Sequence, residues 1–159
     1  LQYENLIPFV DALSGLDYLV QIETNGVYLP QLIELAEEGA IIVISPKAHR
    51  EHGYSDTHMK KLVEVAVKNS CYLKLLIGGP PYDDVPIAVL DHAHKLEESL
   101  FLSPITVYSD SYEGEIGNSW DPRLVNQIET AKNHARAAEL CLKYGFRLSM
   151  QMHNFCRIP

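Results

Sequence analysis

Two short polar segments carry the side chains that are best suited to bind a ligand. The first is Glu-Thr-Asn-Gly at residues 23–26, and the second is Ser-Pro-Lys at residues 45–47. Each one ends an apolar stretch with the composition of a β-strand, predicted at 18–23 and 40–45. Ligands of βα proteins bind at the carboxyl ends of the strands. The paired placement therefore predicts a ligand site, although Glu23 alone is an ordinary turn residue and Lys47 alone an ordinary surface lysine.

The elements that would position these segments alternate regularly along the chain. Apolar spacing, caps and turn residues predict helices at 6–14, 30–38, 55–68, 85–98 and 123–144, and strands at 18–23, 40–45, 71–77, 104–109 and 146–152. Asn25-Gly26 is a strong turn signal because glycine adopts positive φ at no steric cost. This alternation is typical of an α/β fold with a parallel sheet or an open barrel. We expect one domain over residues 1–159.

Several polar residues have two interpretations at this level. On the last strand Ser149, Gln151 and His153 share one face, which indicates either a hydrogen-bonded inner face or a solvated sheet edge. Lys74 lies in the middle of its strand, where it either reaches solvent or pairs with a carboxylate such as Glu23. The acidic residues of the long loop, Asp110, Glu113 and Glu115, are interpreted as part of a solvated loop rather than as a cation site. The histidines are interpreted as loop or surface residues, and they are His49, His52, His58, His92 and His94.

Composition limits the classes of function. The chain has 159 residues, a net charge of −8 and 47% hydrophobic residues, as expected for an ordinary globular protein. Its acidic balance argues against direct binding to nucleic acid, which requires a basic patch. Cys71, Cys141 and Cys156 are widely spaced, which favours reduced thiols and a cytoplasmic location. The chain starts at Leu1 within a helical pattern, so we expect a fragment of a longer protein.

Four segments in order resemble 7-carboxy-7-deazaguanine synthase, a family of the radical S-adenosylmethionine superfamily that acts in queuosine biosynthesis. They are ETNG at 23–26, SPK at 45–47, the strand and polar loop at 107–110, and RLSMQMHNFCRIP at 147–159. Leu1-Gln2 is similar to the end of the family's GGEPLLQ stretch. The resemblance covers nearly the whole chain and implies an open, parallel partial barrel of radical S-adenosylmethionine type without its first strand. In such a fold we expect Leu19, Val43, Leu75, Val107 and Leu148 to be buried.

The resemblance also implies roles for particular residues. The residues implied to bind S-adenosylmethionine are Glu23, Asn25, Ser45, Pro46, Lys47, Tyr108, Ser109 and Asp110. Those implied to face the substrate are Gln151, His153 and the terminal carboxylate of Pro159. We expect Glu23, Ser45, Lys47, Ser109, Gln151 and His153 to converge at one end of the sheet. The sequence departs from the family at Asn154, where lysine is usual, and in a longer loop at 110–122.

The implied reaction converts 6-carboxy-5,6,7,8-tetrahydropterin to 7-carboxy-7-deazaguanine with loss of ammonia. A reduced [4Fe-4S] cluster cleaves S-adenosylmethionine, and the resulting radical abstracts a substrate hydrogen. The three cluster cysteines and the ligand of Mg²⁺ would lie before Leu1, so this chain alone is expected to be inactive. A reducing partner such as flavodoxin and a homodimer are implied as well. The competing hypothesis is a cluster-free α/β module that binds a pterin or nucleoside and acts as a partner subunit.

Overall fold

The sheet consists of five parallel strands in the order in which they occur along the chain. The computed structural model describes residues 6–47, 54–96, 98–108 and 125–150. The strands are β1 (Gln21–Thr24), β2 (Ile41–Ile44), β3 (Tyr72–Ile77), β4 (Leu100–Pro104) and β5 (Arg147–Leu148), and each pairs in parallel with the next. The predicted α/β class and the parallel order are therefore confirmed.

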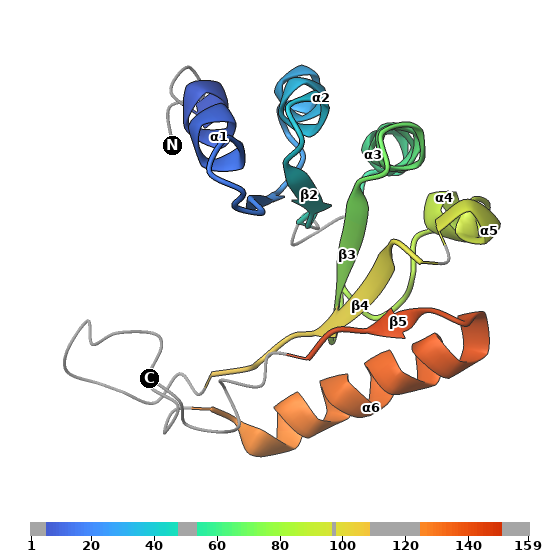
Figure 1. Cartoon of the computed structure of the whole chain (residues 1–159). Coiled ribbons are helices and arrows are strands. Elements are labelled where there is room, and N and C mark those ends of the chain that lie inside the picture. Colours follow the sequence, from blue (N-terminus) through green and yellow to red (C-terminus); the bar gives the residue numbers. More distant parts are fainter. Residues whose placement is uncertain (1–5, 48–53, 97, 109–124, 151–159) are drawn as a thin grey trace.

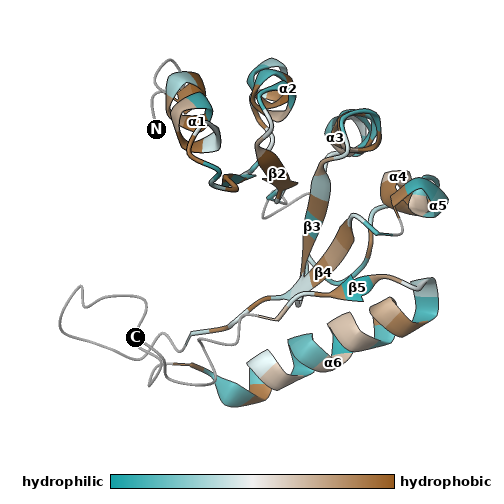
Figure 2. Ribbon diagram, in the orientation of Figure 1, coloured by the Kyte–Doolittle hydropathy of each residue, from teal (hydrophilic) through white to brown (hydrophobic). Residues whose placement is uncertain are grey.

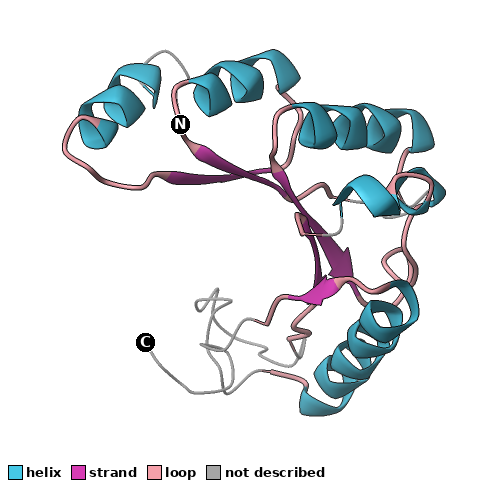
Figure 3. Cartoon of the chain, turned by 45° about the vertical axis from the view of Figure 1, so that its right-hand side comes forward, coloured by secondary structure: helices cyan, strands magenta, loops and turns pink. Residues whose placement is uncertain are grey.

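The helices all lie on the same side of this sheet. They are α1 (Leu6–Ser14), α2 (Leu29–Glu37), α3 (Asp56–Lys68), α4 (Ile87–Leu90), α5 (Ala93–Leu96) and α6 (Gln127–Tyr144). They form an outer arc around the curved strands (Figures 1 and 3). Right-handed crossovers between strands that are adjacent in sequence place every helix on one side, which is the arrangement of a barrel that has not closed.

The core is the layer between the outer face of the sheet and the helices. The strand residues that point to this layer are almost completely buried, and they are Ile42, Ile44, Leu73, Leu75, Ile77, Leu100 and Leu102. Met59, Leu62, Val63 and Ala66 of α3 pack against them, as the helical spacing predicts. Most residues of β2 and β4 are hydrophobic, whereas the helices also carry hydrophilic residues (Figure 2). Each fully buried leucine or isoleucine contributes about 1.5–3 kcal/mol.

The opposite, inner face of the sheet has no helix layer among the described residues, and this explains the wrong prediction of burial at Val43, one of four such predictions. Leu75 is buried as predicted, whereas Leu19 is 89% exposed and Leu148 is 38% exposed. Val43 and Val107 are only half-buried. Val43 alternates with Ile42 and Ile44, so it points to the open side of the sheet. Leu19 precedes β1, which begins only at Gln21, and Val107 follows the end of β4 at Pro104. Leu148 lies in β5, a two-residue strand at the edge of the sheet.

The fourth strand and the helix before it also differ from the prediction. Residues 100–104 pair with β3 from Leu73↔Leu100 to Ile77↔Pro104, so β4 ends where 104–109 was predicted to begin. The sequence pattern favoured 104–109 because its β-branched residues have high strand propensity. The predicted helix 85–98 is divided into the short helices α4 and α5. The last strand was predicted at 146–152, but β5 covers only Arg147–Leu148, and residues 151 and 152 lie outside the described residues.

Candidate functional site

The pairing of β1 with β2 brings the two polar segments together. The register runs from Gln21↔Ile41 to Thr24↔Ile44, and the backbone N–H of Ser45 donates to the carbonyl of Thr24 at 2.6 Å. Because both strands run in the same direction, their carboxyl ends lie on one rim of the sheet. The Glu-Thr-Asn-Gly and Ser-Pro-Lys segments are therefore neighbours in space, as the sequence predicted.

The turn after β1 is held by local hydrogen bonds and by close packing. The carbonyl oxygen of the Asn25 side chain accepts from the Val27 N–H at 3.2 Å, and the Thr24 hydroxyl accepts from the Gly26 N–H at 3.3 Å. Gly26 has a φ of +78°, and a Cβ at this position would lie 2.5 Å from Leu62 Cδ2. Only glycine satisfies both conditions. The side-chain carbonyl of Asn25, a predicted ligand residue, is thus already used within the turn.

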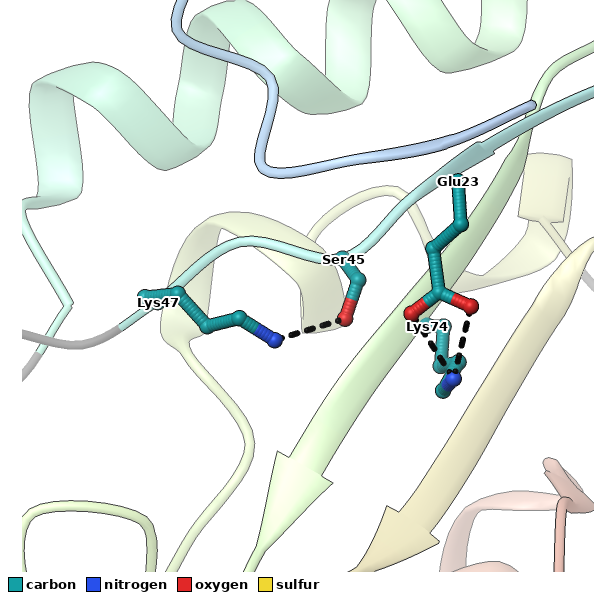
Figure 4. A network of polar contacts seen from close by, with 4 residues as sticks. All are labelled: Glu23, Ser45, Lys47 and Lys74. Atoms are coloured by element: carbon teal, nitrogen blue, oxygen red, sulfur yellow. Dashed lines mark hydrogen bonds and ion pairs between the residues drawn. The ribbon is translucent and has the colours of Figure 1, made fainter. Parts of the chain in front are cut away.

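Four side chains form the polar centre of this rim, which we call the strand-end cluster: Glu23, Ser45, Lys47 and Lys74 (Figure 4). The Lys74 ammonium donates to both carboxylate oxygens of Glu23, at 2.9 and 3.0 Å. The side chains of Lys74 and Glu23 are 16% and 45% exposed, respectively. The structure therefore selects the ion pair over a lysine that reaches solvent alone.

Lys47 occupies a different electrostatic position in the cluster. Its ammonium donates to the Ser45 hydroxyl at 3.3 Å, and Ser45 itself is buried. Desolvation by the surrounding protein lowers the pKa of Lys47, and the Lys74 ammonium lowers it further, whereas the Glu23 carboxylate opposes the shift. Both charges of the ion pair therefore act on Lys47. Pro46, another predicted ligand residue, is buried between Ser45 and Lys47.

A hollow of about 380 Å³ on the inner face of the sheet adjoins this cluster. It is lined by residues of all five strands and the residue that follows β5: Gln21, Glu23, Ile41, Val43, Tyr72, Lys74, Phe101, Arg147 and Ser149. The Arg147 guanidinium lies 5.9 Å from the centre of the Phe101 ring. The Ser103 hydroxyl of β4 is buried without a hydrogen-bond partner among the described residues. Charged, aromatic and hydroxyl groups thus border one space of the size that small ligands occupy.

The chain beyond β4 is held by α6 and by a backbone hydrogen bond to β3, in which the N–H of Ile105 donates to the carbonyl of Ile77 at 2.8 Å. The N–H of Val107 donates to the Thr130 hydroxyl at 3.0 Å, and the Asn133 amide donates to the carbonyl of Ile105 at 2.9 Å. Thr130 and Asn133 are both buried. Tyr108, the one described residue of the predicted 108–110 binding segment, forms an isolated antiparallel bridge with Val125.

Sequence reasoning found part of this arrangement and missed another part. Glu23, Ser45 and Lys47 lie together as expected, whereas Ser109, Asp110, Gln151, His153 and Pro159 lie outside the described residues. Arg147, Tyr72 and Phe101 were not recognised as lining residues. Thr130 and Asn133 were missed too, although they lie on the same helical stripe as Ala137, Leu140 and Cys141. Polar residues on a buried stripe are a signal of hydrogen bonding to a neighbouring backbone.

The described cysteines are poor candidates for a metal cluster. Burial raises the pKa of the Cys71 thiol and of the Cys141 thiol, which disfavours the thiolate that binds metals. Within the described ranges, no group of three or more His, Cys, Asp or Glu side chains is placed to hold a metal ion. Cys156 lies outside those ranges.

No helix among the described residues is long and apolar enough to cross a membrane.

Comparisons with known proteins give little information about function. No protein-family model matches the chain, and no curated protein matches it. One solved structure that matches is the catalytic domain of β-amylase from Paenibacillus polymyxa, with 10% sequence identity and a TM-score of 0.42. The match covers 95% of this chain and 36% of the β-amylase chain, so the chain spans about a third of that structure. At this level of similarity the match carries no argument about function.

Proposed function

We propose that this chain is the C-terminal portion of a 7-carboxy-7-deazaguanine synthase and that its sheet is part of a radical S-adenosylmethionine partial barrel. The observation that carries the proposal is the juxtaposition of the Glu-Thr-Asn-Gly and Ser-Pro-Lys segments on one rim, beside an open inner face. These segments are the ones on which the resemblance to this family depends. Their positions at the ends of neighbouring strands are those expected of ligand-binding residues in βα proteins.

The chemistry of the strand-end cluster fits the amino-acid end of S-adenosylmethionine. Among the described residues, the hydrogen-bond partner of Lys47 is the neutral hydroxyl of Ser45, so the ammonium can receive a carboxylate. A charge-assisted hydrogen bond is about twice as strong as a neutral one, and partial desolvation strengthens the attraction further. In the proposed enzyme Lys47 and Ser45 hold this carboxylate. By the resemblance, the segment 108–110 is proposed to contribute to binding of the adenosine.

The inner face is the proposed position of the pterin. Its hollow offers the hydroxyl of Ser149 and the guanidinium of Arg147. By the resemblance, Gln151 and His153 are proposed to face the pterin as well. An amide, an imidazole and the carboxylate of Pro159 together match the donors and acceptors on the edge of a pterin.

Two groups of the proposed enzyme would be held before Leu1, the [4Fe-4S] cluster and Mg²⁺. The described thiols do not suit the cluster, because they are buried and their pKa values are raised. When bound, S-adenosylmethionine and the cluster supply the radical that starts the rearrangement. The described residues bind and orient the ligands and exclude water around them.

The first experiment is to sequence the DNA upstream of Leu1 and to express the complete reading frame under anaerobic conditions. An in-frame three-cysteine motif, and conversion of 6-carboxy-tetrahydropterin to 7-carboxy-7-deazaguanine detected by mass spectrometry, would support the proposal. A start codon directly at Leu1, or an unrelated upstream domain, would favour the cluster-free binding module.

The second experiment tests the strand-end cluster in that enzyme. Lys47→Met should weaken S-adenosylmethionine binding by about tenfold or more, because a charge-assisted hydrogen bond is lost. Lys60→Met is the matched control, since Lys60 is an exposed lysine of α3. Equal affinities of the two variants would contradict the assignment of Lys47.

A further inference from the structure

The strand-end cluster contains two ammonium groups and one carboxylate, and the two ammonium groups do not share this carboxylate equally. Lys74 donates to both oxygens of Glu23, whereas Lys47 donates to the Ser45 hydroxyl, its hydrogen-bond partner among the described residues. The backbone hydrogen bond from Ser45 to Thr24 places Lys47 and Glu23 on the same rim (Figure 4), where desolvation lowers the pKa of Lys47 and the Glu23 carboxylate raises it. Two ammonium groups therefore compete for one carboxylate, and in this structure Lys74 holds it.

The register of the sheet explains why Lys74 holds it. Glu23 pairs with Val43, and Val43 pairs with Tyr72, so Lys74 lies one inner-face position beyond Tyr72 on β3. β1 and β3 are separated by β2, which places them about 10 Å apart. The short side chain of Val43 lies between them on the inner face, and it leaves room for the long side chains of Glu23 and Lys74 to meet above it.

We propose that Lys74 is a positioning residue that keeps the Glu23 carboxylate occupied, so that the Lys47 ammonium remains available for an anionic ligand. Without Lys74 the Glu23 carboxylate would attract Lys47 and repel a ligand carboxylate approaching the rim. With Lys74 in place the Glu23 charge is neutralised by a group on a different strand. The proposal rests on the proposed function only for the choice of S-adenosylmethionine as the ligand.

The first test measures the pKa of Lys47 in the 159-residue chain by NMR titration of ¹³Cε-labelled lysines. Lys74→Met should raise this pKa, because it removes a repelling charge and frees an attracting one. Glu23→Gln should lower it. Lys132→Met is the control, since it removes an ion pair of similar length, 2.7 Å, on the exposed side of α6 and should leave Lys47 unchanged.

The second test measures S-adenosylmethionine binding to the same variants by calorimetry. Lys74→Met should lower the affinity by about tenfold, whereas Lys74→Arg, which keeps a positive charge beside Glu23, should retain most of it. A role of Lys74 in structure alone would lower the affinity without raising the pKa of Lys47, which the first test measures. Thermal melts followed by circular dichroism check folding, and Lys74→Gln replaces Lys74→Met if the latter unfolds.

The outcomes separate the two proposals. An unchanged Lys47 pKa in Lys74→Met, or an S-adenosylmethionine affinity of that variant equal to that of the unsubstituted protein, would overturn the role of Lys74. If the unsubstituted chain and the complete enzyme both fail to bind S-adenosylmethionine, the proposed function is wrong. In that case the opposite pKa shifts of the two single variants would still establish that Lys74 controls Lys47.

Discussion

Two regions reach the carboxyl rim of the sheet, and they are held there in different ways. The ends of β1 and β2 are positioned by the backbone pairing of neighbouring strands, with Gly26 packed against α3. The segment 105–108 leaves the sheet after β4, and its backbone is bound by the side chains of Thr130 and Asn133. The first region therefore depends on main-chain geometry and steric fit. The second adds hydrogen bonds from individual polar side chains to its backbone bonds, which join Ile105 to Ile77 and Asn126 to Val107.

The largest expected effect is on the first region. Gly26→Ala combines the cost of a positive φ with a Cβ that would lie 2.5 Å from Leu62, and it should destabilise the chain by about 2–4 kcal/mol. Gly39→Ala is the matched control, because Gly39 also has a positive φ but no atom lies within 4 Å of the Cβ that alanine would add. Its loss of stability should therefore be about 1 kcal/mol. Urea denaturation of the two variants measures the difference. Equal losses would show that packing at the turn does not hold this region.

The second region should respond to the loss of one hydroxyl. Thr130→Val keeps the shape of the side chain but leaves the Val107 N–H without its acceptor, and it should cost about 1–3 kcal/mol. Thr130→Ser retains the hydroxyl and should preserve the slow hydrogen exchange of the Val107 amide. Faster exchange in both variants, or in neither, would contradict the assigned hydrogen bond.

The same contrast explains what the sequence could predict. Backbone periodicity and turn residues were sufficient for α3, for the parallel order of the strands and for the meeting of Glu23 with Ser45 and Lys47. The position of β4 was wrong, since Leu100–Pro104 and the segment after it are both apolar, and only the register with β3 distinguishes them. The partner of Lys74 stayed open for a similar reason, because the contact crosses an intervening strand.

The wrong prediction of burial at Val43 has a different origin. Alternation along a strand separates two faces but does not say which face the helices cover. Val43 was expected to be buried, and yet Ile42 and Ile44 point to the helices while Val43 borders the inner hollow. In an open barrel one face of each strand stays uncovered, and an apolar side chain there is only half-buried.

A smaller effect is expected at β3, the strand between the two regions. The Tyr54 hydroxyl donates to the carbonyl of Leu76 at 3.4 Å, and burial raises the pKa of Tyr54 above its ordinary value. The Tyr54 hydroxyl therefore ionises at a lower pH in the unfolded chain than in the folded chain. Its contribution to the free energy of unfolding is fully present below about pH 10 and decreases as the pH rises further. The difference in free energy of unfolding between the unsubstituted protein and Tyr54→Phe should shift by about 1 kcal/mol, against the unsubstituted protein, between pH 10 and pH 11. Chemical denaturation at pH 7, 10 and 11 checks this, and a constant difference across these pH values would contradict it.

The smallest effect on stability should come from the ion pair of the strand-end cluster. Glu23 is 45% exposed, so solvent weakens its attraction to Lys74, and Lys74→Met should cost at most about 1 kcal/mol. Lys132→Met, which breaks the exposed pair with Glu129, should cost a similar or smaller amount. The two ion pairs should thus be nearly equivalent in denaturation experiments and differ sharply in their effect on the Lys47 pKa. A loss of several kcal/mol in Lys74→Met alone would mean that this pair supports the fold of the first region, and the contrast with the side-chain-dependent second region would then disappear.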